Sequence, residues 1–111
     1  MCPDFPLKGW PADVISNLKT NYVPPIVAQS NVQEFYIGRT DNLVASRSRH
    51  GADDIIPLYE TDSADNAIQV EEALIQQFYG DAKCSNENDH AGGGASDDYV
   101  NYVYIALWYV L

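Results

Sequence analysis

The sequence predicts a small, single-domain α+β protein in which helices flank a mixed or antiparallel β-sheet. The chain has 111 residues, a length typical of one domain, here residues 1–111. Hydrophobic residues make up 46% of the chain, which is typical of a folded globule rather than a disordered segment. Segments with the helical period alternate with short runs of β-branched and aromatic residues, and this alternation favours the α+β class.

The first third of the chain predicts a short helix and a strand. Residues 1–25 form a lead-in, in which Pro11 suits the first turn of a helix and apolar residues follow at helical spacing. The pair Pro24-Pro25 predicts that this helix has ended and that residues 26–28 are extended. Residues 32–38 are rich in β-branched and aromatic side chains, so we expect a strand there.

The rest of the chain predicts two helices separated by a strand, then a loop and a C-terminal strand. The first helix is capped by Thr40 or Asp41 and runs to about His50, and a strand follows at residues 55–59. The second helix covers residues 62–79. A polar glycine-rich loop at residues 81–98 then leads to a strand or pair of strands at residues 99–111. Gly51 and Gly80 suit the two helix ends. Because the last segment is nearly all apolar and aromatic, we expect it at the centre of the sheet or buried on both faces.

Charge and composition exclude several classes of function. Six Lys+Arg against sixteen Asp+Glu give a net charge of −10, which disfavours sequence-blind nucleic-acid binding and a polybasic membrane surface. The longest apolar run, residues 102–111, is about half the length that a membrane span needs, so no membrane association is predicted. We expect no disulfide framework from Cys2 and Cys84, and two reduced thiols predict a cytoplasmic protein.

Glu71 lies on an unexpected face of its predicted helix. At about 100° per residue it falls inside the apolar stripe that contains Val70, Leu74 and Phe78. A carboxylate among core residues is costly unless it is paired or binds a cation. Two interpretations are open: a buried or rim carboxylate satisfied by a partner, or a functional group that binds a metal or transfers protons.

The few cations are concentrated in one segment. Three of the six, Arg39, Arg47 and Arg49, lie within eleven residues, with His50 beside them. Helical spacing predicts that Arg47 and His50 share the buried face of Leu43 and that Arg49 points elsewhere. The segment is interpreted either as a local anion site or as a surface helix with ordinary, weak ion pairs.

One motif and its spacing set residues 32–79 apart. Tyr36-Ile37-Gly38 is followed by Thr40 and Leu43, and the later helix carries the stripe-embedded glutamate. The matching residues are Tyr36-Ile37-Gly38, Thr40, Leu43, His50, Ala67, Glu71 and Leu74-Ile75. This pattern resembles the GIY-YIG nuclease domain.

The resemblance implies metal-dependent hydrolysis of phosphodiester bonds. By position, Glu71 is the expected ligand of Mg²⁺ or another divalent metal, and Tyr36 supports removal of a proton from the attacking water. The usual position of the charge-stabilising arginine holds Ser46, so Arg47 is the expected replacement, with His50 in support. Further expected substrate-binding residues are Arg39, Thr40, Asn86 and His90.

The first motif of the family, a glycine-isoleucine-tyrosine strand ahead of the YIG motif, is absent. Residues 102–106 have the character to fill that position from the far end of the chain, as in a circular permutation. This hypothesis predicts that the C-terminal strand pairs directly with residues 32–38.

Three functional interpretations remain open. A hydrolase of this acidity suits a small phosphate-bearing substrate, or DNA delivered by a partner. A catalytically degenerate binding or interaction module is favoured by Ser46 and by the missing first motif. The third is an unrelated α+β domain that shares the motif by chance. A strand-rich C-terminus also offers an edge to a protein partner or a homodimer.

Overall fold

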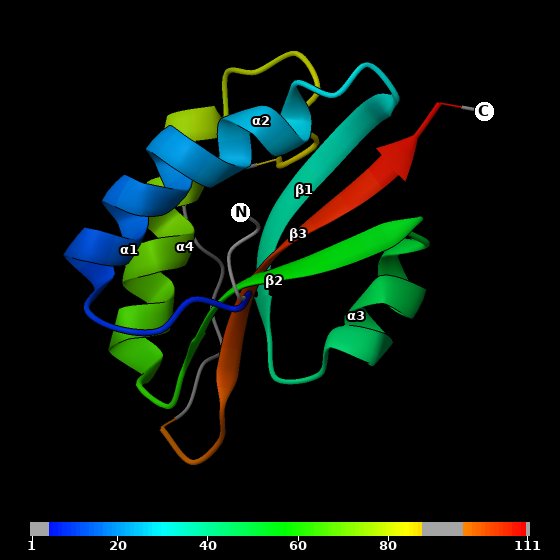
Figure 1. The fold of residues 1–111 in the computed structure, drawn as a ribbon. Helices are drawn as coiled ribbons and strands as arrows, with labels where there is room; N and C mark the ends of the chain where they lie inside the picture. Colours follow the sequence, from blue (N-terminus) through cyan, green and yellow to red (C-terminus); the bar gives the residue numbers. More distant parts are fainter. Residues whose placement is uncertain (1–4, 88–96, 111) are drawn as a thin grey trace.

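The computed structural model describes residues 5–87 and 97–110, and it confirms a small α+β fold (Figure 1). In chain order its elements are α1 (Pro11–Asn17), the π-helical turn η1 (Leu18–Tyr22), α2 (Val23–Val27), β1 (Val32–Thr40), α3 (Leu43–His50), β2 (Asp54–Thr61), α4 (Ala64–Phe78) and β3 (Asn101–Tyr109). Across these two ranges, no helix combines the length and the apolar character needed to cross a membrane.

The three strands form one antiparallel sheet in the order β1-β3-β2. The C-terminal strand is therefore central, as its apolar sequence predicted, and it pairs with β1 from Val32↔Tyr109 to Thr40↔Tyr102. The predicted pairing of this strand with residues 32–38 is confirmed. Because β3 is paired on both sides, it is not the free edge that the sequence offered to a partner. A protein partner or a homodimer stays a prediction.

Short segments pair in parallel with the free edges of both outer strands, β1 and β2. Leu7 bridges to Tyr59 of β2, and Cys84 bridges to Phe35 of β1. The backbone hydrogen bonds include Leu7 N to Leu58 O at 2.9 Å and Phe35 N to Lys83 O at 2.9 Å. The sheet is thus antiparallel at its centre and mixed at its margins, and its edge strands are partly covered.

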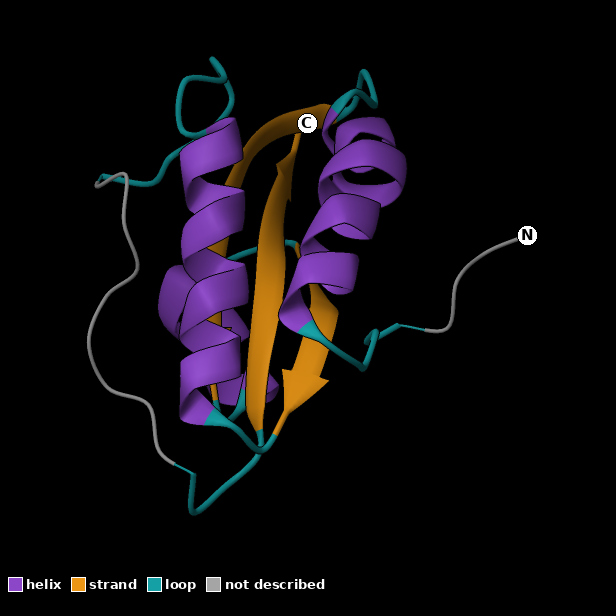
Figure 2. Ribbon diagram, turned by 90° about the vertical axis from the view of Figure 1, so that its left-hand side faces the viewer, coloured by secondary structure: helices purple, strands orange, loops and turns teal. Residues whose placement is uncertain are grey.

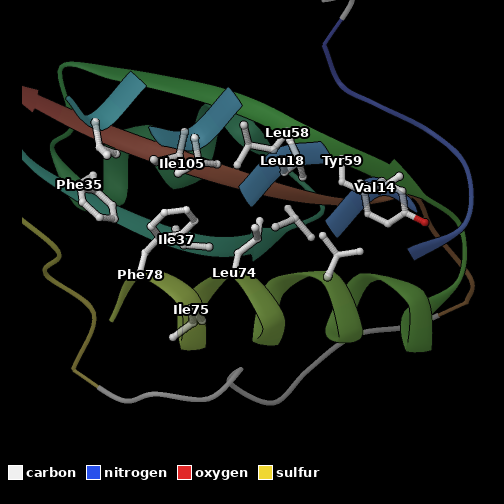
Figure 3. Packing of buried hydrophobic residues seen from close by; sticks show 14 of the residues in the cluster. Val14, Leu18, Phe35, Ile37, Leu58, Tyr59, Leu74, Ile75, Phe78 and Ile105 are labelled. Atoms are coloured by element: carbon white, nitrogen blue, oxygen red, sulfur yellow. The ribbon is translucent and has the colours of Figure 1, made fainter. Parts of the chain in front are cut away.

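The sheet separates two unequal layers of helices. α1, α2 and α4 cover one face, whereas α3 lies on the other (Figures 1 and 2). The larger layer holds the main core, where side chains of α4 point toward the strands (Figure 3). Its largest fully buried side chains include Tyr59, Phe35, Leu18, Ile37, Leu58, Leu74, Ile75, Ile105 and Leu107. The α3 face carries a smaller cluster of Ala52, Tyr104 and Ala106.

The segment around the two consecutive prolines differs from the prediction. Residues 26–28 were expected to be extended, but Val23–Val27 form α2, with proline within its first two positions. Proline is tolerated in a first helical turn because the N–H groups there have no intrahelical acceptor. The four-residue spacing of Val23 and Val27 also places both side chains in the core.

The helix termini largely follow their local chemistry. The N-cap of α3 is Asn42, one residue after Asp41 and two after Thr40, and its side chain accepts a hydrogen bond from Ala45 N at 3.0 Å. Gly51 ends α3 in the left-handed conformation, with φ 64°, as a C-terminal glycine commonly does. Ser63 caps α4 through Asn66 N. The predicted glycine run at residues 92–94 lies outside the described residues.

Candidate functional site

A cluster of aromatic side chains occupies the α3 face of β1. Successive strand residues point to opposite faces, so Tyr36 and Gly38 face α3. Tyr104 is the register partner of Gly38 on the central strand. His50, at the end of α3, places Nε2 3.0 Å from the Tyr104 hydroxyl, and its ring centroid lies 4.7 Å from that of Tyr36. We call Tyr36, His50 and Tyr104 the tyrosine cluster.

Gly38 makes this convergence possible. A Cβ atom on Gly38 would lie 2.5 Å from the Tyr104 hydroxyl oxygen and 2.8 Å from Cε1 of Tyr36. Both distances are shorter than a van der Waals contact, so the two rings occupy the space of the missing side chain. The glycine of the motif is therefore required here by close packing, not by an unusual backbone conformation.

Burial sets the protonation of the tyrosine cluster. It raises the pKa of Tyr104 to about 12, and burial together with the charge of Glu71 raises the pKa of Tyr36. Burial, helped by Arg49, lowers the pKa of His50 below its ordinary value of 6.5. At neutral pH the cluster thus presents two protonated phenols and a neutral imidazole. In the tautomer with its hydrogen on Nδ1, His50 Nε2 accepts from the Tyr104 hydroxyl.

The arginines of α3 are placed differently from the prediction. The side chain of α3 that is fully buried is Ser46, whereas Arg47 is exposed and donates to the carbonyl oxygen of Asp53 at 3.0 Å. Arg49 folds back over Ser46, donating to its Oγ at 3.3 Å, and a hydrogen bond from Arg49 acts to lower the pKa of Tyr104. The prediction that Arg47 points inward is wrong, because the side chain that α3 buries is the small one of Ser46.

Glu71 points inward from α4, as its helical position predicted. It lies among the buried residues of the helix. Its carboxylate accepts a hydrogen bond from the guanidinium of Arg39, and the two side chains are 7% and 4% exposed. Arg39 alternates with Gly38 along β1, so this pair lies on the α4 face of the strand. Burial raises the pKa of Glu71 to about 7, and Arg39 opposes that rise.

These residues do not fit a divalent metal as they stand. Mg²⁺ takes six oxygen ligands in near-octahedral geometry, of which carboxylates and waters are the usual suppliers. The carboxylate of Glu71 is instead held by a guanidinium in a buried ion pair. In the described part of the chain, no group of three or more His, Cys, Asp or Glu side chains is placed to hold a metal.

The remaining predicted substrate-binding residues have structural partners or lie elsewhere. The Thr40 hydroxyl accepts from Asn42 N at 3.0 Å in the turn that leads into α3. The Asn86 side-chain amide accepts from Ile37 N at 2.9 Å and donates to Ile37 O at 2.8 Å, so it continues the ladder at the edge of β1. His90 falls outside the described residues.

Sequence reasoning missed two members of the site, Tyr104 and Arg49. The tyrosines of the last segment were interpreted as sheet and core residues, but register with Gly38 places Tyr104 against His50. The predicted pairing of residues 102–106 with residues 32–38 could have indicated Tyr104, because the register of that pairing places Tyr104 beside Gly38. For Arg49 the sequence held no such signal, because the rotation of α3 decides it.

Chemically, the α3 face combines hydrogen-bond donors with one neutral base. The Tyr36 phenol and the Arg49 guanidinium suit an anion, and the His50 imidazole can accept a proton from Tyr104. Histidine performs this role at physiological pH in many sites. No protein-family model, curated protein or solved structure matches the chain in the comparisons, so the interpretation depends on this geometry and on the sequence pattern.

Proposed function

We propose that the chain hydrolyses phosphodiester bonds, as the likeness of its motifs to GIY-YIG nucleases implies. The observation that carries the proposal is the convergence of Tyr36, His50 and Tyr104 over Gly38, with Arg49 beside them. These groups come from β1, α3 and β3, which are separate in sequence. Convergence of an acid-base group with donors from several elements is the arrangement expected of a reaction site.

Anion recognition falls to the donors of the site. The Arg49 guanidinium offers two N–H groups to non-bridging phosphate oxygens, and the Tyr36 phenol offers its hydroxyl, whereas the single hydroxyl hydrogen of Tyr104 is donated to His50. Tyr36 and Tyr104 keep their protons at neutral pH, since burial raises the pKa of both. Donors that are fixed in place stabilise the charge that develops on the oxygens in the transition state.

Proton removal falls to His50 and Tyr104. A water molecule attacking phosphorus gives a proton to the Tyr104 oxygen while the Tyr104 hydroxyl gives its own to His50 Nε2, 3.0 Å away. The new P–O bond forms from the water oxygen as the P–O bond to the leaving group breaks, the leaving oxygen takes a proton from solvent, and His50 then releases its proton to solvent. A base for this step must be neutral at working pH, and the lowered pKa of His50 supports that.

Net charge narrows the substrate. A protein with a net charge of −10 repels a long DNA duplex, because binding along the duplex requires cationic side chains at the phosphates. A small phosphodiester suits it better, and DNA would need delivery by a partner of opposite charge. The concentration of Arg39, Arg47 and Arg49 near β1 and α3 does not change this balance over the whole surface.

The test compares two arginines of one helix. Hydrolysis of bis(p-nitrophenyl) phosphate and nicking of supercoiled DNA are measured at low ionic strength, with EDTA, Mg²⁺ or Mn²⁺. We expect Arg49→Gln and His50→Ala to lose at least tenfold in kcat/KM, whereas Arg47→Gln keeps the wild-type value. Activity that survives equally in all variants indicates a contaminant, and its absence from the wild type under every condition contradicts the proposal.

A second candidate, a binding module without turnover, is favoured by the occupied carboxylate of Glu71 and by Ser46 at the usual arginine position. It predicts that a dinucleotide shifts the His50 ring resonances in NMR spectra while remaining uncleaved. Loss of that shift in Arg49→Gln but not in Arg47→Gln would place binding at the same face. This result would support the tyrosine cluster as a binding site and contradict its proposed hydrolytic activity.

A further inference from the structure

The most buried charged side chains described in the protein form one pair between the edge strand and the long helix. Arg39 of β1 and Glu71 of α4 are 4% and 7% exposed, and a guanidinium hydrogen bond joins them. Glu71 is surrounded on α4 by Ala67, Val70 and Leu74, each 0% exposed. The pair therefore lies within the main core, on the opposite face of β1 from the tyrosine cluster.

A divalent cation at Glu71 would have to replace a partner that is already in place. The approaching ion would meet the positive guanidinium of Arg39, which cannot lose its proton. It would also bring its waters into a region lined by fully buried apolar side chains. Breaking a buried pair leaves one charge without compensation, which is strongly unfavourable.

We infer that Arg39 is a built-in counter-cation that closes Glu71 to divalent metals. The pair fixes β1 against α4 and thereby holds the strand that carries Tyr36 and Gly38. One part of the inference rests on the proposed function. In that reaction, Arg49 rather than a metal on Glu71 stabilises the negative charge of the phosphate at the tyrosine cluster. Glu71 is then a positioning residue, in contrast to the metal-ligand role that the sequence pattern implied.

The inference is tested by Mn²⁺ binding, which requires no activity. Isothermal titration calorimetry and the electron paramagnetic resonance signal of free Mn²⁺ are recorded at pH 8, above the pKa of Glu71, which is about 7. The variants are wild type, Glu71→Gln, Arg39→Met, the double variant Arg39→Met/Glu71→Gln, and Arg47→Met as a matched control. Circular dichroism shows which of them retain the fold.

We expect wild type, Glu71→Gln and Arg47→Met to bind Mn²⁺ identically, because the other carboxylates are common to all three. Arg39→Met should gain one site, which the double variant loses. A wild-type site that disappears in a folded Glu71→Gln variant would overturn the inference, as would a folded Arg39→Met without the gain. If Arg39→Met does not fold, the comparison of wild type with Glu71→Gln decides. Failure of the hydrolysis assays leaves all of these outcomes unchanged.

Discussion

Replacing Gly38 by alanine tests the packing on which the tyrosine cluster depends. The added methyl carbon would lie 2.5 Å from the Tyr104 hydroxyl oxygen, 2.6 Å from its Cζ and 2.8 Å from Cε1 of Tyr36. Tyr104 is 1% exposed, so its ring has no free space into which to move. We therefore expect the rings to separate and the hydrogen bond to His50 to lengthen or break.

The expected loss of stability combines two opposing contributions. Inserting a methyl group into a packed core costs about 1–3 kcal/mol. Alanine in place of glycine recovers about 0.4–1 kcal/mol, because the unfolded chain loses conformational freedom. With three contacts below 3.0 Å the first contribution dominates, and the net loss should be about 1–2 kcal/mol. For a domain of this size that lowers Tm by about 5–10 °C.

The assay is urea unfolding followed by circular dichroism, with Gly80→Ala as the matched control. A Cβ on Gly80 meets no atom within 4 Å, so this control should be neutral or slightly stabilising. In a Tyr104→Ala background the Gly38→Ala change should cost less than about 0.5 kcal/mol, because its main obstacle is gone. Equal stability of Gly38→Ala and Gly80→Ala would refute the reasoning.

Three further predictions address hydrogen bonding and protonation. Tyr104→Phe removes the bond to His50 Nε2 and should cost about 0.5–1.5 kcal/mol in urea unfolding. Burial raises the pKa of Glu71 from 4.5 to about 7 in the folded protein. The protonated side chain therefore adds to the free energy of unfolding fully below pH 4.5, and this stabilisation is lost as pH rises through 7. Wild type should therefore lose up to about 3 kcal/mol over that range relative to Glu71→Gln, as measured by unfolding at stepped pH. Asn86→Ala should expose the Ile37 amide to hydrogen exchange, whereas Asn86→Asp, which keeps the acceptor, should retain partial protection.

Local signals in the sequence were sufficient for most of the fold. The apolar segment at the C-terminus predicted the central strand, and Gly51 predicted the end of α3. Both are decided by residues close to one another in the chain. The prolines at 24 and 25 gave the wrong result, because a proline excludes the helix interior but permits a first turn, and only the burial of Val23 and Val27 selects the helix.

The candidate site was less predictable, because it depends on how elements rotate. Periodicity alone placed Glu71 correctly, since α4 is long and its apolar stripe is well defined. α3 is short and mostly polar, so helical spacing from Leu43 placed Arg47 on the buried face, whereas the structure buries Ser46 and leaves Arg47 exposed. The partner of Glu71 also lies 32 residues away on another element, and no local pattern indicates such a contact.

Arg39 and Arg49 lie on opposite faces of β1 and have different roles. Arg39 neutralises a carboxylate in the core on one face, while Arg49 lies beside the phenols on the other. The faces are not independent, because the charge of Glu71 raises the pKa of both Tyr36 and Tyr104 across the strand. Keeping Arg39 on Glu71 therefore limits the negative field that the phenols experience. An anion binding at the tyrosine cluster benefits from the same neutralisation, so the buried pair supports the α3 face of β1 without contacting a ligand there.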